Sequence, residues 1–210
     1  MPRTRLIIYG IATPAQAEAC ARAGADAVGL EMSRRGGPGL APEAAWDVLA
    51  ALPPLVASVG VLRDPSEEDF LDIEERCPTD YSQLDGAEPA DLVARLGPRL
   101  FKTVDVPPGG ELAAAAAARA WATMPEVDAV VLRPRDAADL RPVFGTLASA
   151  GGARAILALP PGLIDRAAEL AAAHRPWGLG LPWPALGEGG GAGATLERLL
   201  AALARADLGA

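Results

Sequence analysis

The sequence predicts a single domain over residues 1–210 with the α/β fold of an eight-stranded (β/α)8 TIM barrel. Two observations predict this fold. Short apolar runs alternate with Ala-, Leu-, Arg- and Glu-rich stretches along the whole chain, at roughly 20 to 30 residues per pair, as in parallel sheets with helical crossovers. No linker or break in composition divides the chain, and eight such units favour a closed barrel over an open sheet.

The predicted strands are short runs rich in Val, Ile and Leu, as expected for parallel strands that are buried on both faces. Most of them are bounded by Gly, Pro or Asp, which form turns. The runs occupy residues 5–9, 27–31, 56–62, 81–85, 100–104, 129–133, 155–159 and 177–181.

Helical periodicity fills the intervals between these runs. Pro14, Pro42 and Pro89 suit the first turn of a helix, where no backbone N–H needs a partner, and Gly24 suits the cap after the first helix. The predicted helices occupy residues 14–23, 42–51, 66–76, 89–96, 111–122, 137–150, 163–173 and 194–206.

Composition and charge exclude several function classes. A net charge of −8 argues against a nucleic-acid partner, which would require a basic face. No apolar run is long enough for a membrane span, and the N-terminal apolar run is too short for a signal peptide, so we expect a cytoplasmic protein. Cys20 and Cys77 lie far apart in sequence without a CxxC or Cys/His pattern, so neither a disulfide nor a metal site is expected.

No cofactor is predicted, because the chain has neither a GxGxxG fingerprint after its first strand nor a Walker A sequence. The glycine-rich residues 187–193 leave two alternatives open. Their backbone amides could hold a phosphate, or the stretch could be a flexible connection into the last helix. We favour the connection, because no Lys, Ser or Thr partner follows directly.

Several motifs in the first half of the chain resemble those of one enzyme family. They are Ile7-Ile-Tyr-Gly-Ile-Ala-Thr, Ala23-Gly-Ala-Asp-Ala-Val-Gly, Gln83-Leu-Asp-Gly-Ala-Glu-Pro and Phe101-Lys-Thr, with Leu52-Pro-Pro and Val59-Gly-Val between them. In this order and spacing they resemble phosphoribosylanthranilate isomerase of tryptophan biosynthesis. The resemblance implies a TIM barrel that performs an Amadori rearrangement, an internal aldose-to-ketose shift.

The two catalytic positions that the resemblance implies carry other residues here. The family's general base is a cysteine at the end of the first strand, and the matching residue is Tyr9; its general acid is an aspartate after the sixth strand, and the matching residue is Arg133. A phenol is a poor base near pH 7, and a guanidinium stays protonated. Whether the chain is an enzyme is therefore open.

The phosphate turns of the family are altered as well. The resemblance implies Gly- and Ser-rich turns after the seventh and eighth strands, where backbone N–H groups hold phosphate. The chain instead has Pro160 and Pro161 in one turn and Pro182, Trp183 and Pro184 in the other. Proline has no N–H to donate to an anion.

We expect a charged ring at the barrel mouth. Glu31 and Asp85 end two strands, Arg34 or Arg35 could reach the mouth, and Lys102 is the only lysine of the chain. Lys102 could bind an anion or form a Schiff base, or it could pair with Asp85 or Asp105. Arg133 and Asp85 could equally be an ion pair that fills the old site. His174 is expected far from the mouth.

Three functions remain open. The first is a pseudoenzyme that keeps the isomerase-like barrel, has lost the Amadori activity, and binds a small ligand, possibly anionic, or a protein partner. The second is new chemistry on Lys102, Arg133 and Asp85, and the third is a working isomerase. Trp121, Trp177 and Trp183 are either core residues or part of an interface with a protein partner or a second copy.

Overall fold

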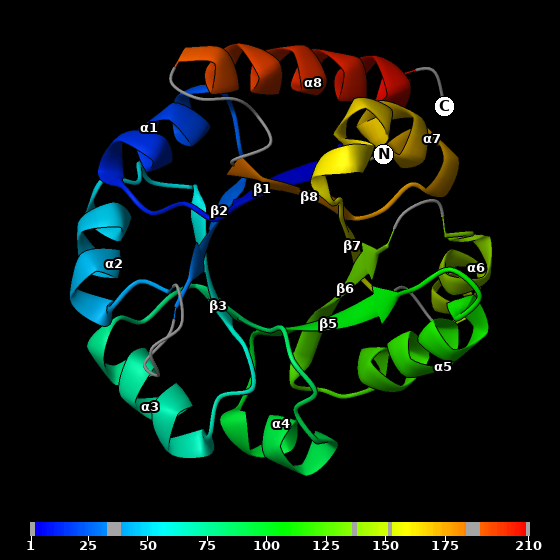
Figure 1. The fold of residues 1–210 in the computed structure, drawn as a ribbon, viewed down its shortest axis with the longest axis horizontal. Helices are drawn as coiled ribbons and strands as arrows, with labels where there is room; N and C mark the ends of the chain where they lie inside the picture. The colour runs from blue at the N-terminus through cyan, green and yellow to red at the C-terminus, as the bar shows by residue number, and fades with distance from the viewer. Residues whose placement is uncertain (1–2, 33–38, 136–137, 151–152, 184–189, 209–210) are drawn as a thin grey trace.

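The computed structural model describes residues 3–32, 39–135, 138–150, 153–183 and 190–208. Within these residues, eight parallel strands form a closed barrel in the order β1 to β8, and the helices surround it (Figure 1). The predicted TIM barrel is confirmed. The strands are β1 (Arg5–Tyr9), β2 (Ala27–Glu31), β3 (Ala57–Leu62), β4 (Tyr81–Leu84), β5 (Leu100–Val106), β6 (Val127–Pro134), β7 (Ala155–Ala158) and β8 (Gly178–Pro182).

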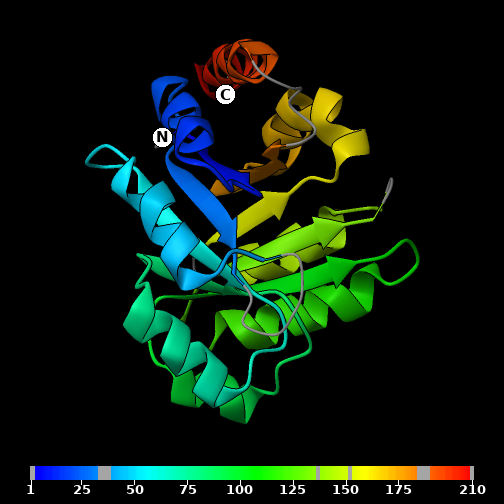
Figure 2. The same ribbon diagram turned by 60° about the vertical axis from the view of Figure 1, so that its left-hand side comes forward.

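Each strand is followed by a helix that returns the chain to the other end of the barrel, as the view turned by 60° also shows (Figure 2). Between β7 and α7 the chain first forms a short 3-10 helix, η1 (Pro161–Arg166). The α-helices are α1 (Pro14–Arg22), α2 (Pro42–Ala50), α3 (Glu67–Arg76), α4 (Ala90–Leu96), α5 (Glu111–Ala122), α6 (Arg141–Ser149), α7 (Ala167–His174) and α8 (Gly190–Leu208).

Local signals explain several helix boundaries. The Thr13 hydroxyl accepts a hydrogen bond from the Gln16 backbone N–H, and the Thr13 backbone N–H donates one to the Gln16 side-chain oxygen, so a capping box starts α1. After this helix Gly24 adopts a φ of +92°, which glycine tolerates without a steric penalty, as predicted. Ser66 caps α3 in the same way, by accepting from the Asp69 N–H.

Two helices differ from their predicted ranges because of proline. The helix predicted over residues 137–150 begins at Arg141, since Pro142 is tolerated only in the first turn. The helix predicted over residues 163–173 is divided into η1 and α7, with Pro161 starting the 3-10 turn. The last helix begins at Gly190, earlier than the predicted residue 194.

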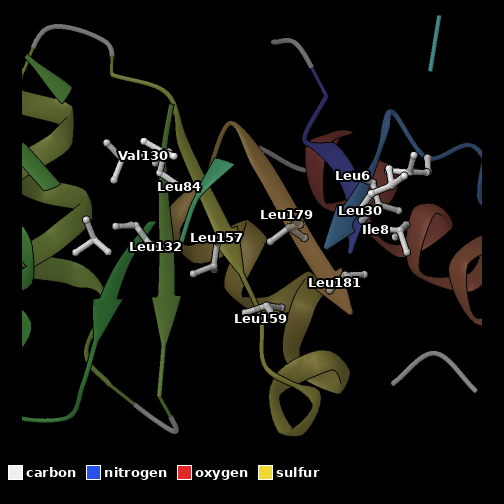
Figure 3. Packing of buried hydrophobic residues seen from close by; sticks show 14 of the residues in the cluster. Leu6, Ile8, Leu30, Leu84, Val130, Leu132, Leu157, Leu159, Leu179 and Leu181 are labelled. Atoms are coloured by element: carbon white, nitrogen blue, oxygen red, sulfur yellow. The ribbon is translucent and has the colours of Figure 1, made fainter. Parts of the chain in front are cut away.

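Alternate residues of each strand face opposite sides of the barrel wall and form two separate apolar layers. The outer layer joins strands to helices, and Figure 3 shows part of it, including Leu6 and Ile8 of β1 and Leu179 and Leu181 of β8. The inner layer consists of strand residues that fill the barrel, and it packs against Tyr9, Tyr81 and Trp177. An odd- or even-numbered position on a strand therefore decides whether a side chain can reach the mouth.

The tryptophans named above serve mainly as packing residues. Trp121 and Trp183 are partly buried against the outer layer, and Trp177 packs against the inner layer with the Arg5 guanidinium 4.4 Å from its ring centroid. Trp46, by contrast, is 48% exposed on α2. In the described ranges, no helix combines the length and the apolar character needed to cross a bilayer.

Candidate functional site

A cavity of about 280 Å³, here called the mouth cavity, lies at the carboxyl ends of the strands. In TIM barrels this end carries the active site. The structure brings four of the predicted residues together in its lining: Tyr9, Glu31, Asp85 and Arg133. The remaining lining residues are Val61, Gln83, Thr103, Val131, Ala158, Leu159, Pro160, Pro161, Gly180 and Pro182.

Tyr9 is fixed in the wall of this cavity by a hydrogen bond and by close packing. Its hydroxyl donates to Oε1 of Gln83 at 2.7 Å, and Nε2 of Gln83 donates to the Thr103 hydroxyl at 3.1 Å. The Tyr9 ring lies against two glycines, since a Cβ added to Gly29 or Gly180 would stand 2.3 or 2.4 Å from a ring atom. Only glycine leaves room for the ring at these positions.

The phenol of Tyr9 is held in its neutral form. Burial raises its pKa above the ordinary value of 10.0, and the negative charges of Asp85 and Glu31 raise it further. Its proton is also already donated to Gln83, an amide that cannot accept it as a base.

Arg133 lies at the end of β6, where two carboxylates fix its guanidinium. Its Nε donates to Oδ1 of Asp105 and its Nη1 to both oxygens of Asp85, each at 2.7 Å. Asp85 is only 6% exposed and forms a second ion pair with Arg63. The predicted pairing of Arg133 with Asp85 is confirmed, and it is part of a network of three residues on β6, β5 and the end of β4 with Arg63 at the rim.

The ion pairs of this network favour the charged forms of Arg133 and Asp105. Burial alone would lower the pKa of Arg133, but the hydrogen bonds that it donates to Asp105 and Asp85 raise its pKa above the ordinary value. Arg133 in turn lowers the pKa of Asp105 through its hydrogen bond and its charge. The guanidinium therefore keeps its proton at any working pH.

Of the two carboxylates in the described lining of the cavity, Glu31 has fewer described side chains that compensate its charge than Asp85. Among the described residues, no hydrogen bond or ion pair to its side chain is found. Loss of hydration and the nearby charge of Asp85 raise its pKa, although Arg63 and Arg133 partly oppose this. A ligand that donates a hydrogen bond could reach it.

Proline forms the wall of the cavity where the resemblance implies phosphate-binding turns. Pro160, Pro161 and Pro182 line the cavity, and none has an N–H to offer. The N–H of Leu159 is already bound to the Gly180 carbonyl oxygen at 2.8 Å. Pro184 and residues 187–189 of the glycine-rich stretch lie outside the described residues, as do Arg34 and Arg35.

The structure corrects the expected location of Lys102. The residue is 2% exposed, and its side chain lies on the outer face of β5, where Nζ is 2.9 Å from Oε2 of Glu88 and donates to the Gly86 carbonyl oxygen at 2.8 Å. The Trp121 ring centroid is 5.3 Å from the same nitrogen. Thr103, the next residue, faces inward, so strand alternation directs Lys102 away from the mouth.

The partner of Lys102 was expected to be Asp85 or Asp105, and this expectation is also wrong. Glu88 takes that role and accepts hydrogen bonds from the backbone N–H groups of Asp64 and Gly86, at 2.9 and 3.0 Å. Glu88 stands within one of the recognised motifs, yet no sequence pattern distinguished it from the exposed glutamates. Glu88 becomes a buried partner of Lys102 and of two backbone N–H groups only once the loop after β4 packs against β5.

His174 does not line the mouth cavity, in line with its expected distance from the mouth. Its ring stacks on Phe144 at 5.0 Å between centroids, and burial lowers its pKa. A search of the described residues for clusters of His, Cys, Asp and Glu that could hold a metal ion found none.

Comparisons with known proteins agree with this barrel. No protein-family model matches the chain. A stretch of 115 residues is 36% identical to N-(5'-phosphoribosyl)anthranilate isomerase of Methanocella arvoryzae, covering 52% of this chain and 54% of that protein. The corresponding protein of Desulforamulus reducens is 38% identical over 103 residues, 48% of each chain. The chain thus matches about half the length of these curated relatives.

A solved structure extends the likeness to the full barrel. The phosphoribosyl anthranilate isomerase of Thermus thermophilus is 31% identical and matches with a TM-score of 0.74, covering 96% of this chain and 99% of that one. The chain belongs to the phosphoribosylanthranilate isomerase family. The isomerase of Thermotoga maritima, at 19% identity and a TM-score of 0.76, shares the fold. The family assignment therefore covers the chain from β1 to α8, including both altered catalytic positions.

Proposed function

We propose that this member of the family binds a small molecule at the mouth of its barrel and does not perform the Amadori rearrangement. One observation carries the proposal: neither position that matches the family's base or acid holds a group able to exchange a proton near neutral pH. General acid–base catalysis requires groups whose pKa lies near the working pH. Tyr9 and Arg133 are shifted away from that range.

Binding is supported by the cavity that remains. Its walls are largely apolar on the side of Val131, Ala158 and Pro160, and polar on the side of Glu31 and Asp85. An apolar pocket with a few convergent polar groups is the usual form of a small-molecule site. A protein partner and a homo-oligomer stay predictions for this chain, although the Thermotoga maritima relative is described as a dimeric isomerase.

A working isomerase is the second candidate, and the names of the Methanocella and Thermus relatives favour it. It requires an ionised Tyr9 and another acid, for which Glu31 is available because its pKa is raised. The hydrogen bond from Tyr9 to Gln83 and the burial of the phenol count against this reading. New chemistry based on a Schiff base at Lys102 has no support, because that amine is sealed behind the barrel wall with Glu88.

A direct assay separates the first two functions. Purified protein mixed with phosphoribosylanthranilate is expected to give no turnover above the uncatalysed rate. A positive control is the Thermus thermophilus isomerase under the same conditions. Any such turnover by this chain would overturn the proposal. Its loss in Tyr9→Phe but not in Tyr81→Phe, where the ring lies deeper in the barrel against Phe101, would establish an isomerase that uses Tyr9.

A further inference from the structure

A second hollow of about 410 Å³ adjoins the mouth cavity, and we call it the side hollow. Its lining comes from the end of β6 and the turn between β7 and η1: Arg133, Pro134, Arg135, Pro160, Gly162 and Leu163. Arg133 and Pro160 line both spaces. A ligand in the mouth cavity can therefore extend past Arg133 into the side hollow without crossing the barrel wall.

The two ionised groups that line the side hollow are both guanidinium groups. Arg133 uses Nε and Nη1 for Asp105 and Asp85, while its Nη2 has no hydrogen bond to any described residue. Arg135 is 68% exposed and reaches Asp105 only at 3.4 Å, the long end of the hydrogen-bond range. Among the described residues, both arginines therefore have N–H donors without a partner, which a ligand could use.

Arg135 is the less well paired of the two guanidinium groups. Arg133 is 2.7 Å from both Asp85 and Asp105, whereas Arg135 reaches Asp105 only at 3.4 Å. Glu31 adds a third negative charge to the cluster, but it acts on Arg63 and Arg133 at the mouth. An anionic group beside Arg135 would give this guanidinium a closer partner.

The backbone holds Arg135 in position. Its N–H donates to the Val106 carbonyl oxygen at 3.0 Å, which ties the start of the loop after β6 to the end of β5. Pro134 and Pro160 line the hollow with conformationally restricted backbone. Neither has a backbone N–H that could bind an anion in place of the arginines. The side hollow therefore recognises charge through side chains and not through backbone amides.

We propose that Arg133 and Arg135 form an anion subsite in the side hollow, which binds the carboxylate or phosphate group of a small organic ligand. The proposal deepens the proposed function and rests on it, because the apolar part of the ligand would occupy the mouth cavity. Guanidinium groups bind planar carboxylates and phosphates through paired N–H donors. The ligand class is a compact organic anion, such as an aromatic carboxylate or phosphate monoester.

Isothermal titration of the full chain with three probes of similar shape tests this subsite. Phenyl phosphate and benzoate carry the two kinds of anion, and benzamide is the neutral analogue. We expect at least one anion to bind about tenfold more tightly than benzamide, with an affinity that falls as salt is added, because exposed charges are screened. The stronger of the two anions identifies the head group.

Substitutions of single arginines test whether the anion binds at Arg135. Arg135→Gln is expected to weaken anion binding about tenfold and leave benzamide binding unchanged, and Arg135→Lys to restore part of the loss. Arg154→Gln is the matched control, because Arg154 is similarly exposed but packs near Trp177 away from the mouth. Thermal melting checks that each variant is folded.

Equal affinities for the anions and benzamide, no binding of any probe, or an Arg135→Gln variant that binds like the wild type would overturn the subsite. None of these results bears on the isomerase assay, which tests the proposed function separately. Turnover of phosphoribosylanthranilate would overturn the proposed function even if Arg135 bound an anion.

Discussion

Two clusters of charge lie on neighbouring strands of the barrel and have opposite surroundings. The Lys102–Glu88 pair is sealed between β5 and the helices, with side chains that are 3% and 1% exposed. The Arg133–Asp85–Asp105 network faces the mouth cavity, where Arg133 is 30% and Asp105 39% exposed. Their difference shows that an unusual charged residue in a strand motif identifies a ligand site only if it faces inward.

The sealed pair should contribute more to stability than the mouth network. In Lys102→Met the carboxylate of Glu88 stays buried without its cation, and we expect the free energy of unfolding to fall by about 3–5 kcal/mol. Urea denaturation at pH 7 measures this loss. The control is Arg95→Met on α4, whose ion pairs with Glu67 and Asp91 are exposed to solvent and should contribute little to stability. Equal losses in the two variants would contradict the contrast between sealed and open clusters.

Removing a charge from the mouth network should lower the free energy of unfolding less than removing Lys102. Arg133→Gln leaves Asp85 paired with Arg63, so we expect a loss of about 1–2 kcal/mol at pH 7. Because Arg133 lowers the pKa of Asp105, the stabilisation is present above the unfolded pKa of about 3.9 and is lost as the pH falls through the lower folded pKa. The difference between wild type and variant in urea denaturation should therefore shrink between pH 5 and pH 3. A constant difference would mean that Asp105 does not share the pairing.

Substitution of Glu31 should change the free energy of unfolding least, and it should raise stability where the other two substitutions lower it. Its pKa is raised, so its favourable contribution is present below the unfolded pKa of about 4.3 and is lost as the pH rises through the folded pKa. Glu31→Gln is then expected to stabilise the protein at pH 7, by less than about 1 kcal/mol, and to have no effect at pH 4. Thermal melting at both pH values measures this, with Glu75→Gln on the exposed side of α3 as control. Destabilisation at pH 7 would show that Glu31 has a cationic partner.

The barrel could be predicted from sequence because its signals are local. Apolar runs, proline at helix starts and Gly24 after α1 each act within a few residues, and the predicted strands lie within two residues of those observed. The divided helix around η1 was missed because Pro161 changes a local pattern that was otherwise helical. The clustering of Tyr9, Glu31, Asp85 and Arg133 also followed from topology, since all four end parallel strands.

The side-chain interactions of the charged residues could not be predicted in the same way. Lys102 was assigned to the mouth although it occupies an outward position, one residue before the inward Thr103, and strand alternation alone could have corrected this. Glu88 gave no signal, because its burial depends on how the loop after β4 packs against β5. The role of Arg135 depends on the side hollow, which forms between two loops that are distant in sequence.

The Tyr9 ring, seated on Gly29 and Gly180, has a consequence for the response of the protein to ligands. A binding protein gains stability from its ligand by mass action, in proportion to the logarithm of ligand concentration. Here the Tyr9 side chain, which belongs to the chain itself, always fills part of the barrel interior. The stability that its packing provides therefore does not depend on the concentration of any ligand. That part of the stability should be the same in a starved cell and in a cell rich in metabolites.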